Sequence, residues 1–214
     1  MNAVIVCPGT IPLKEELLLF LKPGFILIAA DGAANRLLED DIWPDVVIGD
    51  FDSISTSTLE ALEKRNIETI CKVSQDRCDL EKALDLCVER HYTHVHIVGM
   101  FGGRADYNLA NAVVLFQFMA HLSITAVEPH FKMFPHQGSR TFNSSPAQIM
   151  SFVPLGVCAG VTLEGVKYTL KNAHFKIGEM GVSNVALGDT FTVTIGEGYA
   201  WVFVGDSEYA FTRP

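Results

Sequence analysis

The sequence predicts two domains, an α/β N-terminal domain with a mainly parallel sheet, followed by a C-terminal all-β sandwich. Two observations indicate this fold class. The first 127 residues alternate apolar runs with segments of helical periodicity, whereas from about residue 130 the segments shorten and Gly and Pro interrupt them. Alternating strands and helices are typical of parallel sheets with right-handed crossovers, and series of short strands with Gly turns are typical of sandwiches. A chain of 214 residues can hold both domains.

We expect the first domain at residues 1-128, with six strands in chain order. Most are apolar runs bounded by polar residues, Gly or Pro, and the fourth is strand-like; the first is closed by Pro8-Gly9 and the third follows Pro44. The expected strands are Val4–Cys7, Phe25–Ala30, Val46–Ile48, Ile67–Val73, His94–Val98 and Ser123–Val127.

Helices are expected between these strands. The fourth predicted helix has apolar residues at helical spacing, and the third has two apolar positions between charged flanks, which is typical of a surface helix. The last is mostly apolar. The expected helices are Lys14–Leu21, Ala33–Glu39, Ser57–Arg65, Leu80–Arg90 and Tyr107–Ala120.

The second domain is expected at residues 137-214 as a sandwich of short strands. Glu164-Gly165 and Gly196-Glu197-Gly198 are turn signals within it. We expect the linker at Glu128–His136, and leave open that one of the short segments pairs with the first domain. The expected strands of this region are Phe131–Phe134, Arg140–Phe142, Gln148–Val153, Ala159–Glu164, Lys167–Phe175, Thr190–Ile195 and Tyr199–Val204.

Composition excludes several classes of protein. The net charge of -9 argues against a general binder of nucleic acid or of membrane surfaces, which would carry a basic patch. We find no apolar stretch long enough to span a membrane and no basic, apolar leader at the N-terminus, so we expect a cytoplasmic protein. The five cysteines are odd in number and form no Cys-x-x-Cys pair, which favours free thiols over disulfides or a zinc site.

Aspartates stand where the predicted strands of the first domain end. Because the carboxyl ends of neighbouring parallel strands form one edge, and ligands bind there, these carboxylates would lie close together and repel one another without a cation. The simplest interpretation is a Mg²⁺ site that handles a phosphorylated substrate. The six residues are Asp31, Asp50, Asp52, Asp76, Asp79 and Asp106.

The segment Gly49-Asp50-Phe51-Asp52-Ser53 is the first candidate for metal binding. In extended backbone, residues two apart point the same way, so Asp50 and Asp52 would form a Mg²⁺ clamp with Phe51 facing the core. The alternative is a polar turn in which an aspartate or a following serine caps the next helix.

A carboxylate and an ammonium group come three residues apart, at Asp79 and Lys82. Residues at this spacing share a helix face, so the pair could hold a metal ion and a phosphate respectively. The alternative is a helix cap followed by a solvated lysine. Asp31, after the second strand, could bind the metal through water or hold a ribose hydroxyl, and a helix cap is again the alternative.

A glycine-rich loop follows the strand at His94–Val98. Gly102 and Gly103 would let the backbone approach a phosphate, and Arg104 could hold phosphate oxygens in a bidentate manner. The loop is neither a Walker A loop nor a dinucleotide-binding Gly-x-Gly-x-x-Gly pattern. The alternative is a structural turn with Asp106 as a helix cap.

These motifs occur together in one order that resembles the thiamine pyrophosphokinase family, over nearly the whole chain. The region after residue 160 adds a segment that looks like the family's thiamine-contacting segment. The motifs are Asp31-Gly32-Ala33-Ala34-Asn35, Gly49-Asp50-Phe51-Asp52-Ser53, Gln75-Asp76-x-x-Asp79-Leu80-x-Lys82, Gly102-Gly103-Arg104-x-Asp106, Gly165-Val166-Lys167-Tyr168-x-Leu170 and Gly181-Val182-Ser183-Asn184.

The resemblance implies an enzyme that moves a diphosphate group from ATP to the hydroxyl of thiamine, with AMP as the other product. It implies a homodimer with thiamine held between one subunit's α/β domain and its partner's β domain. It implies Mg²⁺ at Asp50, Asp52 and Asp79, and catalytic roles for these and for Asp76, Lys82, Arg104 and Asp106. The cofactor- and substrate-binding residues it implies are Asp31, Gln75, Gly102, Gly103, Ser183, Asn184 and Trp201, with Tyr168 as a further candidate to pack on thiamine.

The chain departs from the family pattern at two positions. Tyr107 stands where the family usually has His, and Cys78 where Thr is common. Tyr can donate a hydrogen bond but is not a base near neutral pH, so activity or nucleotide preference could differ. We expect Asp76 or Asp106 to accept the substrate's proton. Two other hypotheses stay open: a diphosphokinase that acts on another alcohol, such as a pterin, and a non-catalytic nucleotide or thiamine sensor.

Overall fold

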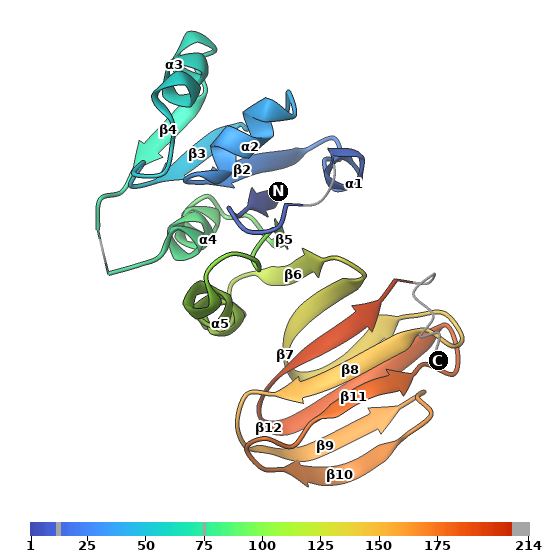
Figure 1. The fold of residues 1–214 in the computed structure, drawn as a ribbon. Coiled ribbons are helices and arrows are strands. Elements are labelled where there is room, and N and C mark those ends of the chain that lie inside the picture. The colour runs from blue at the N-terminus through green and yellow to red at the C-terminus, as the bar shows by residue number, and fades with distance from the viewer. Residues whose placement is uncertain (12–13, 75, 207–214) are drawn as a thin grey trace. The chain divides into compact units, whose positions relative to one another are not determined.

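The computed structural model describes residues 1–11, 14–74 and 76–206 (Figure 1), and the chain divides into two compact units, Met1–Glu128 and Pro129–Pro214. The first unit is α/β and the second is built from strands, so the predicted fold class is confirmed. No helix in the described part of the chain is both long and apolar enough to cross a membrane.

The first unit contains a six-stranded sheet in the order β6-β5-β1-β2-β3-β4, and every neighbouring pair in it is parallel. The strand order reverses between β1 and β5, because the chain runs outward from β1 to β4 and then returns to place β5 and β6 on the other side. The strands are β1 (Asn2–Val6), β2 (Phe25–Ala30), β3 (Val46–Gly49), β4 (Glu68–Cys71), β5 (His94–Val98) and β6 (Ser123–Glu128).

Helices cover both faces of this sheet, with α4 and α5 on the face opposite α1, α2 and α3 (Figure 1). Strands covered on both faces have no need for polar alternation, which is why β1, β2 and β3 are continuous apolar runs. The helical segments are α1 (Lys14–Leu18), α2 (Ala33–Glu39), α3 (Thr56–Lys64), α4 (Asp79–Glu89), α5 (Ala105–Val114) and the 3₁₀ turn η1 (Leu115–Gln117).

The predicted helices all form, but two are shorter than expected. The first ends at Leu18 rather than Leu21, ahead of the turn at Pro23-Gly24. The last helix ends at Val114 and continues only as η1. Apolar composition alone favoured longer helices in both places. An apolar run does not show where the hydrogen-bond pattern of an α-helix ends.

The second unit is a sandwich whose two sheets share their longest strands. The strands β7 and β12 pair with each other along their full lengths, while β9 pairs with the first half of β12 and β8 with its second half. The outer strands β10 and β11 pair with β9 and β8. The strands are β7 (Phe131–Asn143), β8 (Ile149–Pro154), β9 (Cys158–Glu164), β10 (Leu170–Phe175), β11 (Gly181–Val185) and β12 (Thr190–Gly205).

Three expectations for this unit were wrong. Gly196-Glu197-Gly198 is not a turn: it lies inside β12, where the pairing register with β7 shifts between Ile195 and Ala200, as in a β-bulge. The four short strands expected in these regions therefore merge in pairs into the two long strands β7 and β12. The expected linker is also replaced by structure, because β6 continues to Glu128 and β7 begins at Phe131. Strand β11 was not expected as a strand at all.

A close approach at Gly9 gives a prediction about stability. A side chain there would overlap the carbonyl oxygen of Phe101, because the loop after β1 lies directly on the loop after β5. We expect Gly9→Ala to lower the free energy of unfolding by about 1–3 kcal/mol, the usual cost of overpacking. Urea unfolding measures this. Gly188→Ala is the control, since no atom lies within 4 Å of its added Cβ; equal effects of the two changes would contradict the packing argument.

Candidate active site

The candidate site lies at the point where the strand order of the first unit reverses. Ligands of open α/β sheets bind at such a switch point, beyond the carboxyl ends of the strands. The loops after β1 and β5 are joined here by two hydrogen bonds, from Gly9 N to Gly99 O at 2.9 Å and from Thr10 N to Phe101 O at 2.6 Å. A hollow of about 410 Å³ opens beside them.

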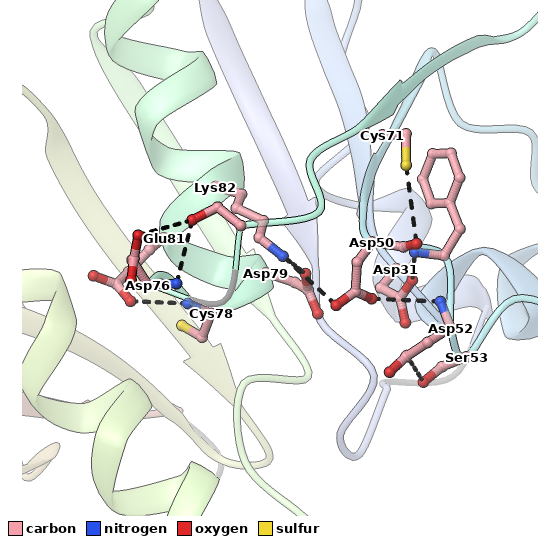
Figure 2. A network of polar contacts seen from close by, with 12 residues as sticks. Asp31, Asp50, Asp52, Ser53, Cys71, Asp76, Cys78, Asp79, Glu81 and Lys82 are labelled. Carbon is pink, nitrogen blue, oxygen red and sulfur yellow. Dashed lines mark hydrogen bonds and ion pairs between the residues drawn. The ribbon is translucent and has the colours of Figure 1, made fainter.

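Three carboxylates meet in this hollow, one from the end of each of two strands and one from the start of α4. Asp31, Asp50 and Asp79 each place one oxygen within 4.8 Å of the others (Figure 2). Asp31 is buried and the other two are half-buried. Oxygen atoms of carboxylates are the ligands that Mg²⁺ prefers, so this donor set fits the expected cation.

The side chain of Lys82 supplies the positive charge next to this cluster. Its Nζ donates to Asp79 Oδ1 at 2.9 Å and lies 4.0 Å from Asp50 Oδ2, and the side chain is only 4% exposed. Burial raises the pKa of Asp79, and the nearby Asp31 and Asp50 charges add to the effect, whereas Lys82 opposes it. The lysine therefore balances only part of the crowded negative charge.

Asp52 does not join this cluster as the sequence suggested. The expected geometry required extended backbone, but Phe51 has a φ of 67°, which turns Asp52 away from Asp50. Asp52 is exposed at the rim of the hollow, and its Oδ1 accepts a hydrogen bond from Ser53 Oγ at 2.7 Å (Figure 2). The prediction that Phe51 faces the core is confirmed, since its ring packs against the apolar cluster of this unit.

Asp31 is close to Asp50 because of an unusual backbone conformation. Its φ is 44°, and its Oδ1 accepts a hydrogen bond from Phe51 N at 3.0 Å, so the carboxylate fastens the turn after β3. It is not the side-chain cap of α2. Gly49 allows this contact, because a Cβ there would come within 2.8 Å of the Asp31 Cβ.

The glycine-rich loop after β5 lines the hollow through Gly99, Met100, Gly102, Gly103 and Arg104. Several of its amide groups are already used: Gly102 N donates to Asn108 Oδ1 at 3.0 Å. The φ values of Gly102 and Gly103 are 105° and 71°, a region that favours glycine. No acceptor for the amide of Gly103 occurs among the described residues, and this amide can donate to a ligand.

The side chain of Arg104 is exposed and paired. Its guanidinium makes two hydrogen bonds to Asp106, at 3.1 Å and 2.6 Å, and lies 4.6 Å from the ring centre of Tyr107. Asp106 lies outside the lining of the hollow, so its role here is to hold Arg104. An arginine held at the rim in this way can exchange its carboxylate partner for phosphate oxygens.

Two residues of the third motif, Gln75 and Asp76, precede α4 in the sequence. Asp76 is exposed, accepts a hydrogen bond from Ser74 Oγ at 3.2 Å, and does not line the hollow. Gln75 lies outside the described residues. Cys78, in place of the family's usual threonine, is the N-cap of α4 and forms a capping box with Glu81.

In the second unit the expected substrate residues have different surroundings. Tyr168 is exposed, and Ser183 is exposed with a φ of 60°. Asn184 is buried and uses its amide to hold the backbone of Tyr168, donating to Tyr168 O at 2.8 Å and accepting from Tyr168 N at 3.0 Å. Trp201 is 3% exposed, and the centre of its ring lies 6.3 Å from that of Phe203.

Several lining residues were not predicted from the sequence. Cys7, Pro8 and Gly9 follow β1, and Asn111 lies on α5, where its Nδ2 donates to Met100 O at 2.7 Å. The rule that identified the aspartates could have found the first three, because β1 is also a strand that ends at this edge.

An α/β unit with crowded carboxylates, a buried lysine and a glycine-rich loop at its switch point is typical of enzymes that bind phosphorylated ligands with a divalent cation. The family model for the thiamin pyrophosphokinase catalytic domain matches residues 19–127, and the model for the thiamin pyrophosphokinase vitamin B1 binding domain matches residues 141–200.

Individual relatives agree with these matches. The chain is 28% identical over 200 residues to a thiamine pyrophosphokinase of Bacillus subtilis, covering 91% of this chain and 94% of that relative. The crystal structure of thiamine pyrophosphokinase from Bacillus subtilis has a TM-score of 0.85 at 25% identity, covering 97% of this chain and 100% of that one. Yeast thiamin pyrophosphokinase shares the fold, with a TM-score of 0.82 at 17% identity, over 95% of this chain and 86% of that one. The chain belongs to the thiamin pyrophosphokinase family.

Proposed function

We propose that this protein is a thiamine diphosphokinase, which transfers a diphosphate group from ATP to the hydroxyl of thiamine and releases AMP. The observation that carries the proposal is that both units match the family, the first as its catalytic domain and the second as its vitamin B1 binding domain. A chain that matched only the first would leave the acceptor open. The cluster of Asp31, Asp50 and Asp79 with Lys82 supports the phosphate-transfer half of the proposal.

Asp50 and Asp79 are the proposed core of the metal site. Asp31 completes the cluster seen in the structure, and Asp52 at the rim is a fourth candidate ligand. Mg²⁺ bound there would neutralise charge that develops on the transferred group. Lys82, which is buried behind the carboxylates and does not line the hollow, would act on the phosphates through its charge, while Arg104 and the Gly103 amide would bind them from the loop. We assign the proton acceptor to neither Asp76 nor Asp106, because neither lines the hollow.

The second unit is proposed to bind thiamine, which is a cation with aromatic rings. The exposed ring of Tyr168 suits such a ligand through cation–π contact. Family membership supports a homodimer in which thiamine is held between one subunit's α/β unit and its partner's β unit. The exposed apolar side chains of Val182 and Leu187 in the second unit, and of Leu109 and Val113 on α5, are surfaces that a dimer could bury.

Product analysis tests the proposed reaction. With ATP, thiamine and Mg²⁺, we expect AMP and thiamine diphosphate in equal amounts, and no ADP. Omitting Mg²⁺ with a chelator should abolish product. Formation of ADP, or no reaction at any nucleotide concentration, would contradict the proposal.

The two other hypotheses make different predictions in the same assay. A pterin or another alcohol would outcompete thiamine as acceptor if it were the substrate, and a sensor would bind thiamine without forming AMP. Nothing in the comparisons favours either. We also propose a cytoplasmic location, supported by the five cysteines, all of which are free thiols in the structure.

A further inference from the structure

Glu128 ends the last strand of the first unit and reaches the glycine-rich loop. Val98 of β5 pairs with Val127 of β6, so the loop and Glu128 begin at the same level of the sheet. One carboxylate oxygen, Glu128 Oε1, accepts hydrogen bonds from both Met100 N at 3.1 Å and Phe101 N at 3.3 Å. These two residues follow Gly99 at the start of the loop that lines the candidate active site.

The environment of Glu128 is unusual for a carboxylate. The residue is half-buried, burial raises its pKa, and the two backbone hydrogen bonds oppose that shift. No ion pair to Glu128 occurs in the described part of the chain. Since a partly buried carboxylate without a cation is costly, its two amide donors are its main compensation. Within the described residues, the hydrogen bonds of this acidic side chain therefore go to the loop.

Glu128 also decides which loop amides stay available. Met100 and Phe101 donate to Glu128, and Gly102 donates to Asn108, so three successive amides face protein acceptors. Asn111 fixes the same segment from the other side through Met100 O. What remains for a ligand is the next part of the loop, the Gly103 amide and the Arg104 side chain. The direction of these groups depends on how the preceding residues are held.

We infer that Glu128 is a positioning residue for the nucleotide phosphates: it holds the backbone at Met100 and Phe101 so that Gly103 and Arg104 are aimed into the hollow. Glu128 itself does not line the hollow. The identity of the ligand, ATP, rests on the proposed function, whereas the contacts between Glu128 and the loop do not depend on it. Small errors in positioning cost rate steeply, so losing this acceptor should be visible in catalysis as well as in stability.

Two variants separate positioning from a merely structural role. Glu128→Ala removes the acceptor. Glu128→Gln keeps one carbonyl oxygen, and since a single oxygen accepts both hydrogen bonds in the protein, the glutamine can restore them. Glu63→Ala and Glu63→Gln, on the exposed face of α3, are matched controls that change the same charge elsewhere.

Steady-state kinetics on the folded full-length variants give the first readout. For Glu128→Ala we expect the KM for ATP to rise about tenfold or more and kcat to fall, while the KM for thiamine changes less than about twofold. Glu128→Gln should return both parameters to within about threefold of the unchanged protein. A purely structural role predicts instead that both KM values stay constant and only the amount of folded enzyme changes.

Nucleotide binding without turnover gives the second readout. Titration with α,β-methylene-ATP and Mg²⁺, in the absence of thiamine, should show the same order: unchanged protein, then Glu128→Gln, then Glu128→Ala as the weakest binder. If the protein makes no AMP but this order holds, the proposed reaction fails and the positioning role stands. If Glu128→Ala binds and turns over ATP like the Glu63 variants, or if both KM values rise equally, the positioning role is wrong.

Discussion

Replacing Asp50 with Asn should lower the rate of AMP formation by about 10²–10³-fold, comparable to the loss of one preorganised charge-stabilising group. Asp50 lies in the carboxylate cluster and within 4.0 Å of the Lys82 ammonium, so the change removes a proposed metal ligand without changing the shape of the side chain. Initial rates at saturating ATP and thiamine measure the effect. Asp189→Asn, which neutralises an exposed aspartate of the second unit, is the control.

The same variant gives a prediction that does not depend on activity. In the protein without metal, three crowded carboxylates repel one another, so Asp50→Asn should leave Tm unchanged or raise it. The proposed Mg²⁺ site exists only in the folded protein, so Mg²⁺ should raise the Tm of the unchanged protein, and this shift should shrink in Asp50→Asn. A Tm shift of full size together with full activity would remove Asp50 from the metal site.

The third ligand can be identified by comparing Asp31→Asn with Asp52→Asn. An asparagine at position 31 can still accept the hydrogen bond from Phe51 N, so that variant should fold normally. If the cluster in the structure is the metal site, Asp31→Asn should weaken the Mg²⁺-dependent Tm shift more than Asp52→Asn. The reverse order would show that the cation lies at the exposed rim, as the spacing of Asp50 and Asp52 predicted.

The sequence predicted the edge of the sheet but not which side chains meet there. Asp50, Asp79 and Lys82 follow from strand ends and helical spacing. The exchange of Asp52 for Asp31 depends on the φ of 44° at Asp31 and of 67° at Phe51. Positive φ is uncommon even for Asp, although Asp adopts it more often than most residues, and it is rarer for Phe. Glu128 stands at a strand end as well, but it was assigned to a linker because the pattern of the sequence changes near residue 130.

The order of elements in the first unit was predictable because both faces of its sheet are covered, which makes the central strands β1, β2 and β3 distinct apolar runs. The second unit was harder to predict. Gly196-Glu197-Gly198 has the composition of a turn, yet β12 continues through it, because β7 pairs with it on both sides of the register shift. Whether glycines end a strand or bend it is decided by the partner strand, which local sequence does not show.

Replacing Lys82 with Met should lower activity, as Asp50→Asn does. Unlike Asp50→Asn, it should also destabilise the metal-free protein. We expect turnover to fall by about 10²-fold, because the charge of the ammonium is proposed to stabilise the phosphates in the neighbouring hollow. Met keeps the length of the buried side chain, which is 4% exposed, but removes the charge 2.9 Å from Asp79. Without metal, the variant should lose about 1–3 kcal/mol of unfolding free energy, the usual cost of leaving a charged partner unsatisfied.

Added Mg²⁺ and mildly acidic pH should each reduce this loss of stability. With the lysine gone, the carboxylates attract a cation more strongly, so the Mg²⁺-dependent rise in Tm should be larger than in the unchanged protein. The pKa of Asp79 is already raised by burial and by its acidic neighbours, and removing Lys82 should raise it further. An acid whose folded pKa is raised destabilises the protein once ionised, so stability falls as pH rises through that pKa. The deficit of Lys82→Met should therefore be smaller in mild acid than at pH 8.

Thermal unfolding with and without Mg²⁺, at acidic and at mildly basic pH, tests this pattern in one set of measurements. Lys64→Met is the matched control, because that lysine is exposed on α3. It should show neither the loss of stability, nor the larger Mg²⁺ shift, nor the dependence on pH. A uniform loss of Tm at every pH and Mg²⁺ concentration would mean that Lys82 contributes packing alone. A smaller Mg²⁺ shift than in the unchanged protein would mean that the lysine helps to build the cation site rather than competing with the cation for the carboxylates.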